Sequence, residues 1–193
     1  MATNRARRKR FEKTLAFVRK HFPAGEVILD LGEENELSRF LKMEGGFNIR
    51  NTTGQDLDIE YSVVKDYRNI TAFEIFEHQF APFNLLNSAC GKLIASVPLR
   101  LWFASEYWNY KEKYDCHYHE FSVRQFNHLL DRTGWLIKDC ENWKSYDSSF
   151  GIRSLLRRVY PRYYIVYAEK QDQLSSTDKQ NIKQSLQKID MDR

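Results

Sequence analysis

The chain has 193 residues, of which 42% are hydrophobic and 15% aromatic, which is enough to bury the core of one ordinary domain and leaves no room for a second large one. It contains no run of about 18 apolar residues that could span a membrane, and its arginine-rich start lacks the apolar stretch of a secretory signal, so we expect a cytoplasmic protein. Thirty basic against 26 acidic residues give a net charge of only +4, a field too weak by itself to indicate nucleic-acid binding.

An amphipathic helix is predicted at the start of the chain. Behind the basic run RARRKR at 5–10, four apolar residues recur at helical spacing: Phe11, Leu15, Val18 and Phe22. Pro23 ends the pattern. The basic run could contact phosphates or an anionic membrane, but a solvated arm is the simpler interpretation, and we therefore expect no nucleic-acid partner.

Six short segments are predicted as strands, because they are rich in apolar or β-forming residues and bounded by turn residues. They are residues 27–31, 47–51, 70–76, 92–98, 135–143 and 162–170. The segments between them that carry helix signals are residues 33–46, 82–91, 122–134 and 153–162. Strands separated by short helices predict an open α/β sheet with its ligand crevice at the carboxyl ends of the strands.

The connection at 99–121 is long and rich in aromatic residues, which is typical of a functional loop such as a lid. Its aromatic side chains could clamp a flat substrate or simply pack the loop onto the sheet: Trp102, Phe103, Tyr107, Trp108 and Tyr110. Cys116, His117 and His119, with Cys140, resemble a fragment of a zinc site. Paired ligand spacings are missing, however, so we expect no metal.

Five motifs occur in an order that resembles one enzyme family. They are VILDLG at 27–32, DLD at 56–58, ITAFEIFEH at 70–78, ACGKLIASVP at 89–98 and HYHEFSVRQFNHLLDRTGW at 117–135. Together they resemble the class I S-adenosylmethionine-dependent methyltransferases, most closely the small bacterial members with a fEvxEH motif. The resemblance implies a three-layer α/β sandwich with a Rossmann-like, mostly parallel, seven-stranded sheet whose last strand is antiparallel. That domain would cover residues 1–170, with 171–193 as a polar tail that is either disordered or a loose helix.

The same resemblance implies a cofactor site. Asp30 and Gly32 match the acidic residue and first glycine of the cofactor loop, and either Asp56 or Asp58 matches the acidic residue near the ribose or adenine. The motif after the third predicted strand would line the methyl-donor pocket, and its members are Glu74, Glu77 and His78.

His117 and His119 match a histidine segment that faces the acceptor, and His78 is a second choice. A hydroxyl or amine acceptor must lose a proton, and a histidine with a pKa of about 6.5 is a suitable base. The resemblance thus implies methyl transfer from S-adenosylmethionine to a small-molecule acceptor, with His117 and His119 as catalytic candidates.

The first loop departs from the family pattern, because Glu34 and Glu36 replace glycines. Glycine at these positions lets the backbone approach the cofactor closely, and two carboxylates would also repel the cofactor's own carboxylate. Their side chains could instead point to solvent, where they would suit the positive end of a helix dipole. The alternative to an enzyme is therefore a non-catalytic binding or interaction module that has kept the fold and lost the cofactor.

Overall fold

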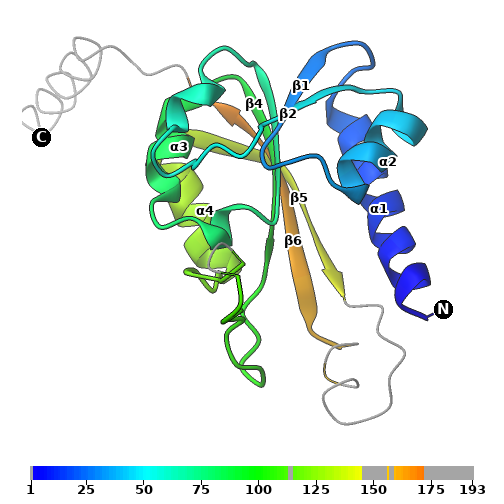
Figure 1. Ribbon diagram of the computed structural model, residues 1–193, viewed down its shortest axis with the longest axis vertical. Helices are drawn as coiled ribbons and strands as arrows, with labels where there is room; N and C mark the ends of the chain where they lie inside the picture. The colour runs from blue at the N-terminus through cyan, green and yellow to red at the C-terminus, as the bar shows by residue number, and fades with distance from the viewer. Residues whose placement is uncertain (1, 113–114, 145–155, 157–158, 172–193) are drawn as a thin grey trace, which may run out of the picture.

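The computed structural model describes residues 2–112, 115–144, 156 and 159–171. Its centre is a six-stranded sheet in the order β2-β1-β3-β4-β6-β5 (Figure 1). The strands are β1 Val27–Asp30, β2 Asn48–Asn51, β3 Asn69–Phe73, β4 Lys92–Pro98, β5 Trp135–Lys144 and β6 Pro161–Lys170. The first four are parallel to one another, whereas β6 pairs antiparallel with both β4 and β5.

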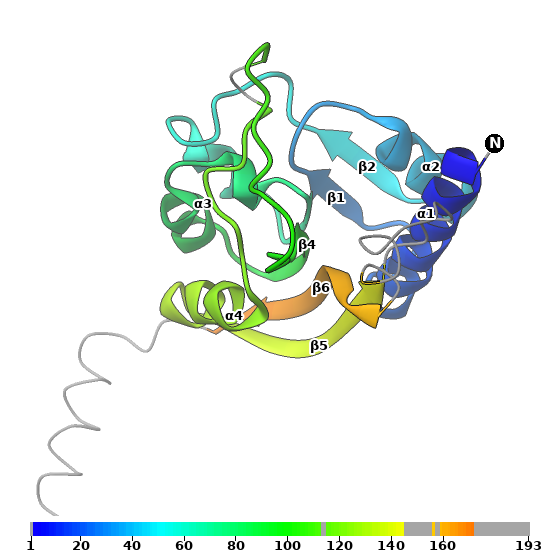
Figure 2. The ribbon, with the colours of Figure 1, turned by 90° about the horizontal axis from the view of Figure 1, so that it is seen from below.

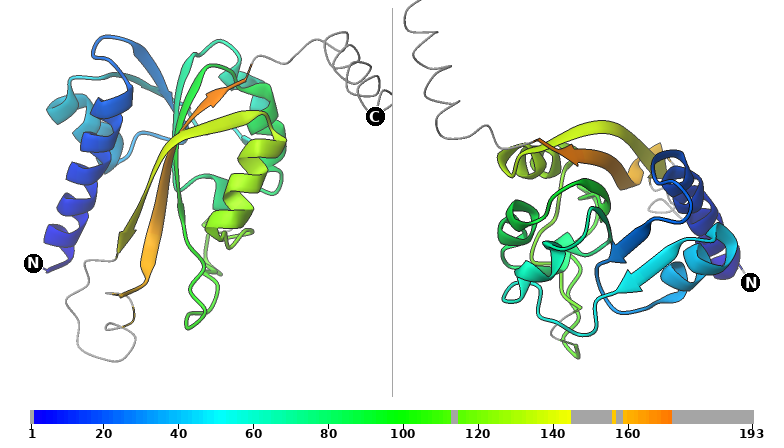
Figure 3. Two further views of the ribbon diagram at one scale, coloured as in Figure 1. Left: turned by 180° about the vertical axis from the view of Figure 1, so that it is seen from behind. Right: turned by 90° about the horizontal axis from the view of Figure 1, so that it is seen from above.

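Helices cover both faces of the sheet, which makes the three-layer sandwich that the sequence predicts. The helices α1 Ala2–His21 and α2 Glu36–Gly45 lie on one side, and α3 Pro82–Ser88 and α4 Val123–Arg132 lie on the other (Figures 1 and 3). Two short 3-10 helices, η1 Tyr61–Val64 and η2 Phe76–His78, occur in the connections before and after β3.

Local signals fix where the helices begin and end. The Asn35 side chain accepts hydrogen bonds from the backbone N–H groups of Leu37 and Ser38 and so caps α2, which ends at Gly46 in the left-handed conformation. At α4, Ser122 and Gln125 form the predicted capping box. These caps satisfy backbone groups that a helix end leaves without an intrahelical partner.

The apolar residues form one cluster on each face of the sheet. The cluster under α3 and α4 includes Leu85, Phe126 and Trp135, and the cluster under α1 and α2 includes Val18, Phe22 and Leu41. Each fully buried side chain of this size contributes about 1.5–3 kcal/mol. The long N-terminal helix is therefore part of the folded domain, with its apolar side against the sheet.

The predicted strand positions are confirmed, with shifts of a few residues at the ends. The seventh strand that the family resemblance implies has no counterpart among the described residues, where the chain passes from β2 to β3 through a loop and η1. Half of the predicted helix at 153–162 falls outside the described residues, and its last two residues, Pro161 and Arg162, belong to β6 instead. The predicted polar tail at 171–193 lies outside the described residues from residue 172 onward. Within the described part of the chain, no helix is long and apolar enough to cross a membrane.

Candidate functional site

A hollow of about 970 Å³ lies beyond the carboxyl ends of β1, β2 and β3, at the edge that Figure 2 views from below. Four segments line it: Gly32 and Glu33 after β1, residues within 52–59 after β2, residues within 75–80 after β3, and Asp115 and Tyr118 of the connection 99–121. Its position is the one that an open α/β sheet provides for ligands. Its volume is typical of a small-molecule site.

The tight turn after β1 needs glycine at position 32. Gly32 has φ +96°, and a Cβ added there would lie 3.1 Å from Cδ1 of Ile75. Its backbone N–H donates to Oγ1 of the buried Thr52 at 2.8 Å, which ties the turn to the segment after β2. The turn therefore presents bare backbone to the hollow, as the sequence predicts.

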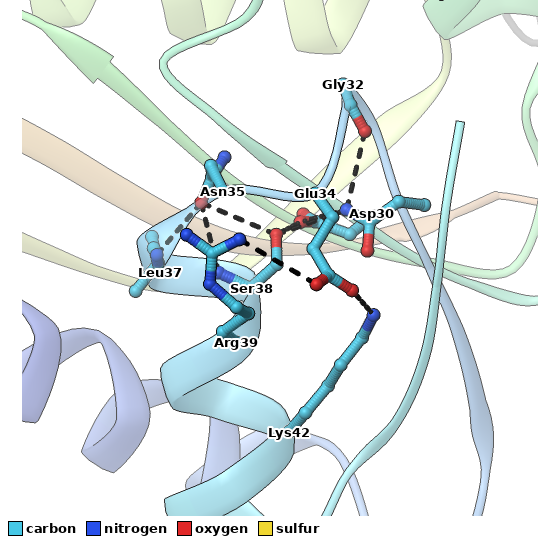
Figure 4. Close-up of polar contacts among 9 residues, drawn as sticks. Asp30, Gly32, Glu34, Asn35, Leu37, Ser38, Arg39 and Lys42 are labelled. Carbon is cyan, nitrogen blue, oxygen red and sulfur yellow. Dashed lines mark hydrogen bonds and ion pairs between the residues drawn. The ribbon is translucent and has the colours of Figure 1, made fainter. Parts of the chain in front are cut away.

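Asp30 lies beneath this turn, where it is hydrogen-bonded to the neighbouring elements, and it does not line the hollow. Asp30 is 3% exposed, and its carboxylate accepts a hydrogen bond from Ser38 Oγ at 2.6 Å (Figure 4). It also accepts from Thr71 Oγ1 at 2.7 Å and from Asn51 Nδ2 at 3.0 Å. Burial raises the pKa of Asp30, although the three hydrogen bonds oppose that shift. The carboxyl group joins β1, α2, β2 and β3 at the base of the site.

Glu34 and Glu36 do not line the hollow. The Glu34 carboxylate pairs with Lys42 and lies 3.9 Å from Arg39 Nη1, both on α2 (Figure 4). Glu36 pairs with Arg7 of α1. The third glutamate of the loop, Glu33, is the one that faces the hollow. The two acids that replace glycines are thus engaged with cations on the surface.

Asp56 and Asp58, which the sequence leaves as alternatives, both line the hollow but differ in their partners. The Asp58 carboxylate accepts from the backbone N–H groups of Phe80 at 2.9 Å and Ala81 at 2.7 Å, which fixes the start of α3. Oδ1 of Asp56 accepts from the backbone N–H of Asp58 at 3.1 Å, which is an Asx turn. Because Asp58 is occupied with both oxygens, Asp56 is the better placed to meet a ligand.

Glu74 follows β3 with φ +56°, an uncommon conformation for a residue with a side chain. Its carboxylate pairs with Arg10 of α1, whose guanidinium also lies over the ring of Tyr163, 5.2 Å from the centroid. The predicted solvated arm is therefore wrong for Arg10, which links α1 to the end of β3. Glu74 does not line the hollow.

Glu77, His78 and His117 lie close together beside the hollow. Glu77 is 1% exposed, and burial raises its pKa well above the ordinary value. The rings of His78 and His117 meet edge to face, with centroids 4.9 Å apart. His78 lines the hollow, and burial, followed by the neighbouring His117, lowers its pKa.

The side chain of His119 is directed away from this group, although its backbone N–H donates to the backbone carbonyl oxygen of Glu77 at 3.2 Å. Its ring stacks on Phe121 with centroids 5.4 Å apart, and its Nε2 lies 3.4 Å from the carbonyl oxygen of Phe80. The structure thus brings together His78 and His117 and separates them from His119. Cys116 and Cys140 are free thiols, and Cys140 is on β5, away from the histidine segment.

The aromatic residues of the connection 99–121 have two environments. Trp102 and Phe103 pack against Tyr160, whereas Trp108 meets Tyr118 edge to face. Tyr118 in turn stacks on Phe80 with centroids 3.8 Å apart, and both rings line the hollow. Tyr110 is 93% exposed. None of the five aromatic residues of the predicted clamp lines the hollow, and Trp108 reaches it only through its contact with Tyr118.

Gln79, Phe80 and Tyr118 also line the hollow, although they are not among the site residues predicted from the sequence. Gln79 is buried at 4% exposed, lines the hollow, and neither its amide oxygen nor its amide nitrogen has a hydrogen-bond partner in the described part of the chain. Buried polar groups are rarely left unpaired. Its position directly after the EH pair of the motif is the signal that could have found it.

Comparisons with known proteins bear on the fold. No protein-family model matches the sequence, and no curated protein matches it. Among solved structures, an S-adenosylmethionine-dependent methyltransferase from Mesorhizobium loti aligns over 80% of this chain and 96% of its own, with TM-score 0.51 and 13% identity. A chain from the complex of the Haloferax volcanii Trm112 methyltransferase activator with a methyltransferase candidate aligns over 86% and 94%, with TM-score 0.58 and 13% identity.

A third structure is a phosphoethanolamine N-methyltransferase 2 from Haemonchus contortus, solved with phosphomonomethylethanolamine and S-adenosylhomocysteine. It aligns over 83% of this chain with TM-score 0.57 and 10% identity, and the chain spans about half (53%) of that protein's length. These matches establish that the chain has the class I S-adenosylmethionine-dependent methyltransferase fold. At 10–13% identity, these matches show the fold but not the activity, which must be inferred from the residues of the site.

Proposed function

We propose that the protein binds S-adenosylmethionine in the hollow beside Gly32 and transfers its methyl group to a small-molecule acceptor. The observation that carries the proposal is the hollow itself, which a bare glycine turn opens at the carboxyl ends of β1 to β3. The fold is shared with S-adenosylmethionine-dependent methyltransferases, and open α/β sheets bind their ligands at this edge.

The charge of the hollow supports a cationic ligand. Its lining includes four carboxylic acids, which are Glu33, Asp56, Asp58 and Asp115, and among the lining residues that the structure describes there is no lysine or arginine. S-adenosylmethionine carries a sulfonium and an ammonium group against a single carboxylate, so it enters as a cation. Charge-assisted hydrogen bonds to such groups are about twice as strong as neutral ones.

The lining also offers polar and aromatic contacts that a nucleoside requires. Asp56 is the carboxylate that we assign to the ribose hydroxyls, since Asp58 holds the start of α3. The stacked rings of Phe80 and Tyr118 can pack against the adenine. The buried amide of Gln79, which has no hydrogen-bond partner among the residues that the structure describes, can then donate to and accept from the bound ligand.

The protein's part in methyl transfer is mainly to align donor and acceptor, which can lower the barrier by about 7–11 kcal/mol. His117 and His119 remain our candidates for accepting a proton from a hydroxyl or amine acceptor. His78 lines the hollow itself and has a lowered pKa, so it is neutral and able to accept a proton at neutral pH.

Calorimetric titration with S-adenosylhomocysteine tests cofactor binding. We expect one molecule to bind per chain with a Kd below about 1 mM, the upper end of the range for enzyme substrates. S-adenosylmethionine should bind more tightly than the product at low salt, because the acidic lining favours the additional positive charge. If neither compound gives heat, the enzyme proposal is wrong.

The second candidate, a module that has lost the cofactor, rests on Glu34 and Glu36. Because both carboxylates pair with cations outside the hollow, the double variant Glu34→Ala/Glu36→Ala should change the affinity for S-adenosylhomocysteine by less than about twofold, within the usual effect of surface substitutions. Calorimetry on the two proteins checks this. Binding that only the variant shows would support the non-catalytic module instead.

A further inference from the structure

Glu77 is a buried acid to which the proposed methyl transfer assigns no role. It is 1% exposed, and neither carboxylate oxygen has a hydrogen-bond partner among the described residues. The side chain of His78 comes to 4.0 Å, measured from Nε2 to Oε1 of Glu77, which is beyond hydrogen-bond distance. Burying a carboxylate is costly in free energy unless the carboxylate is paired with a cation or coordinates a metal.

His78 has one ring nitrogen free for a ligand. Its Nδ1 lies 3.0 Å from the backbone carbonyl oxygen of Cys116. A carbonyl oxygen can only accept, so Nδ1 carries the hydrogen and Nε2 keeps a lone pair. This Nε2 is also the ring nitrogen that lies 4.0 Å from Oε1 of the Glu77 carboxylate.

His117 is held in the same way. Its Nδ1 lies 3.3 Å from Oε1 of Glu120, which can accept a hydrogen bond as a carboxylate, and its Nε2 is then free. A histidine with one nitrogen bonded to a carbonyl or carboxylate and the other nitrogen free is the usual arrangement of a metal-binding histidine.

One potential ligand atom from each of Glu77, His78 and His117 lies within 4.8 Å of the other two. We propose that these three residues bind a divalent first-row transition ion such as Zn²⁺, Mn²⁺ or Fe²⁺ at the edge of the hollow. Two imidazoles and one carboxylate suit these ions, and three protein ligands leave coordination positions open. Because His78 lines the hollow, the open positions face it.

This site, which rests on the proposed function, points to acceptors that carry a hydroxyl group. The acceptor oxygen binds the ion, which lowers the pKa of the hydroxyl, and its proton leaves to solvent. An oxygen lone pair then forms a bond to the donor methyl carbon while the carbon–sulfur bond breaks and its electron pair goes to sulfur. The products are the methyl ether and S-adenosylhomocysteine. In this assignment His117 is a ligand rather than the base.

Titrating the full chain with Co²⁺ after chelator treatment tests the metal site without any cofactor present. We expect visible absorption bands that saturate at one ion per chain, and loss of those bands when Zn²⁺ is added. In the Glu77→Gln variant the affinity for Co²⁺ should fall by more than about 100-fold, and in Glu120→Gln by about 10–100-fold, the usual effect of a residue that orients a ligand.

His119→Gln is the matched control, since His119 lies two residues from His117 in the chain but outside the cluster. It should bind Co²⁺ as the unmodified protein does. The metal-free Glu77→Gln protein should be no less stable to urea, because a neutral amide of the same shape replaces a buried carboxyl that has no hydrogen-bond partner in the described part of the chain. A loss of stability would mean that Glu77 is structural and would contradict the proposal.

Acetohydroxamate, a small ligand that binds metals through two oxygens, tests whether the bound ion has coordination positions open to an acceptor. Added to the Co²⁺-loaded protein, it should change the visible spectrum, and an unchanged spectrum would exclude an acceptor bound to the ion. Absence of Co²⁺ binding in a protein that still binds S-adenosylhomocysteine would overturn the metal site alone. Absence of S-adenosylhomocysteine binding in a protein that holds Co²⁺ would overturn the methyltransferase proposal instead.

Discussion

Replacing Asp30 with alanine should lower the free energy of unfolding by about 3–5 kcal/mol, because each buried hydrogen-bonding group left without its partner costs about 1–3 kcal/mol. Ser38 and Thr71 are fully buried and both donate to this carboxylate. Asn51 donates to it as well. Urea denaturation followed by circular dichroism measures the loss, and a change below about 1 kcal/mol would contradict the role of Asp30 as the centre of this network.

The variant Asp30→Asn separates the hydrogen bonds from the charge. The amide oxygen can replace Oδ2 and accept from Ser38 and Asn51, and the Thr71 hydroxyl, which faces Oδ1, can turn to accept from the amide nitrogen, so we expect a smaller loss than for alanine. Burial raises the pKa of Asp30 above its ordinary 3.8, so the folded state holds this proton more tightly than the unfolded state. The stabilisation from this group is complete below pH 3.8 and is lost as the pH rises through the raised pKa. The stability of the asparagine variant relative to the unmodified protein should therefore increase over that range.

Replacing Gly32 with alanine should weaken S-adenosylhomocysteine binding at least about tenfold, or about 1.4 kcal/mol. At φ +96° a side chain is strained, and its Cβ would lie 3.1 Å from Ile75, so the turn or Ile75 must shift at the mouth of the hollow. A Cβ at this position also prevents close approach of the cofactor to the backbone. Calorimetry on the folded variant measures the change.

Gly25→Ala is the matched control for this experiment. Gly25 has nearly the same backbone conformation, with φ +93°, but a Cβ there would have no neighbour within 4 Å. It precedes β1, so it lies at the opposite edge of the sheet from Gly32. Both variants carry a similar backbone strain of about 1–2 kcal/mol, and only the Gly32 variant should lose affinity. Equal losses in the two proteins would show that instability, not the turn, controls binding.

The sequence by itself determined the order and type of the elements. Apolar runs marked β1, β3 and β4, the Ser122 capping box marked α4, and Gly46 marked the end of α2. These signals act over a few neighbouring residues, through periodicity, capping and the conformational freedom of glycine, so they can be recognised without knowing the rest of the fold. The motif order then predicted the methyltransferase fold that the solved structures share.

Only the tertiary structure decided which acids belong to the site. The sequence shows Glu33, Glu34 and Glu36 as one acidic loop, but cations on α1 and α2 hold Glu36 and Glu34 outside, and Glu33 alone faces the hollow. The direction of a side chain around a turn depends on partners from other segments, which local sequence does not contain.

The same reason explains the group of Glu77, His78 and His117. Its members come from η2 and from the connection 99–121, segments that lie far apart in the chain and meet only because both follow strands whose carboxyl ends share one edge of the sheet. The expectation of no metal is based on the spacing of ligand residues along the chain. That spacing does not show which distant residues come together in the folded molecule. Burial of Glu77 without a hydrogen-bond partner among the described residues is a property of the folded molecule, and our proposal of a metal site rests on it.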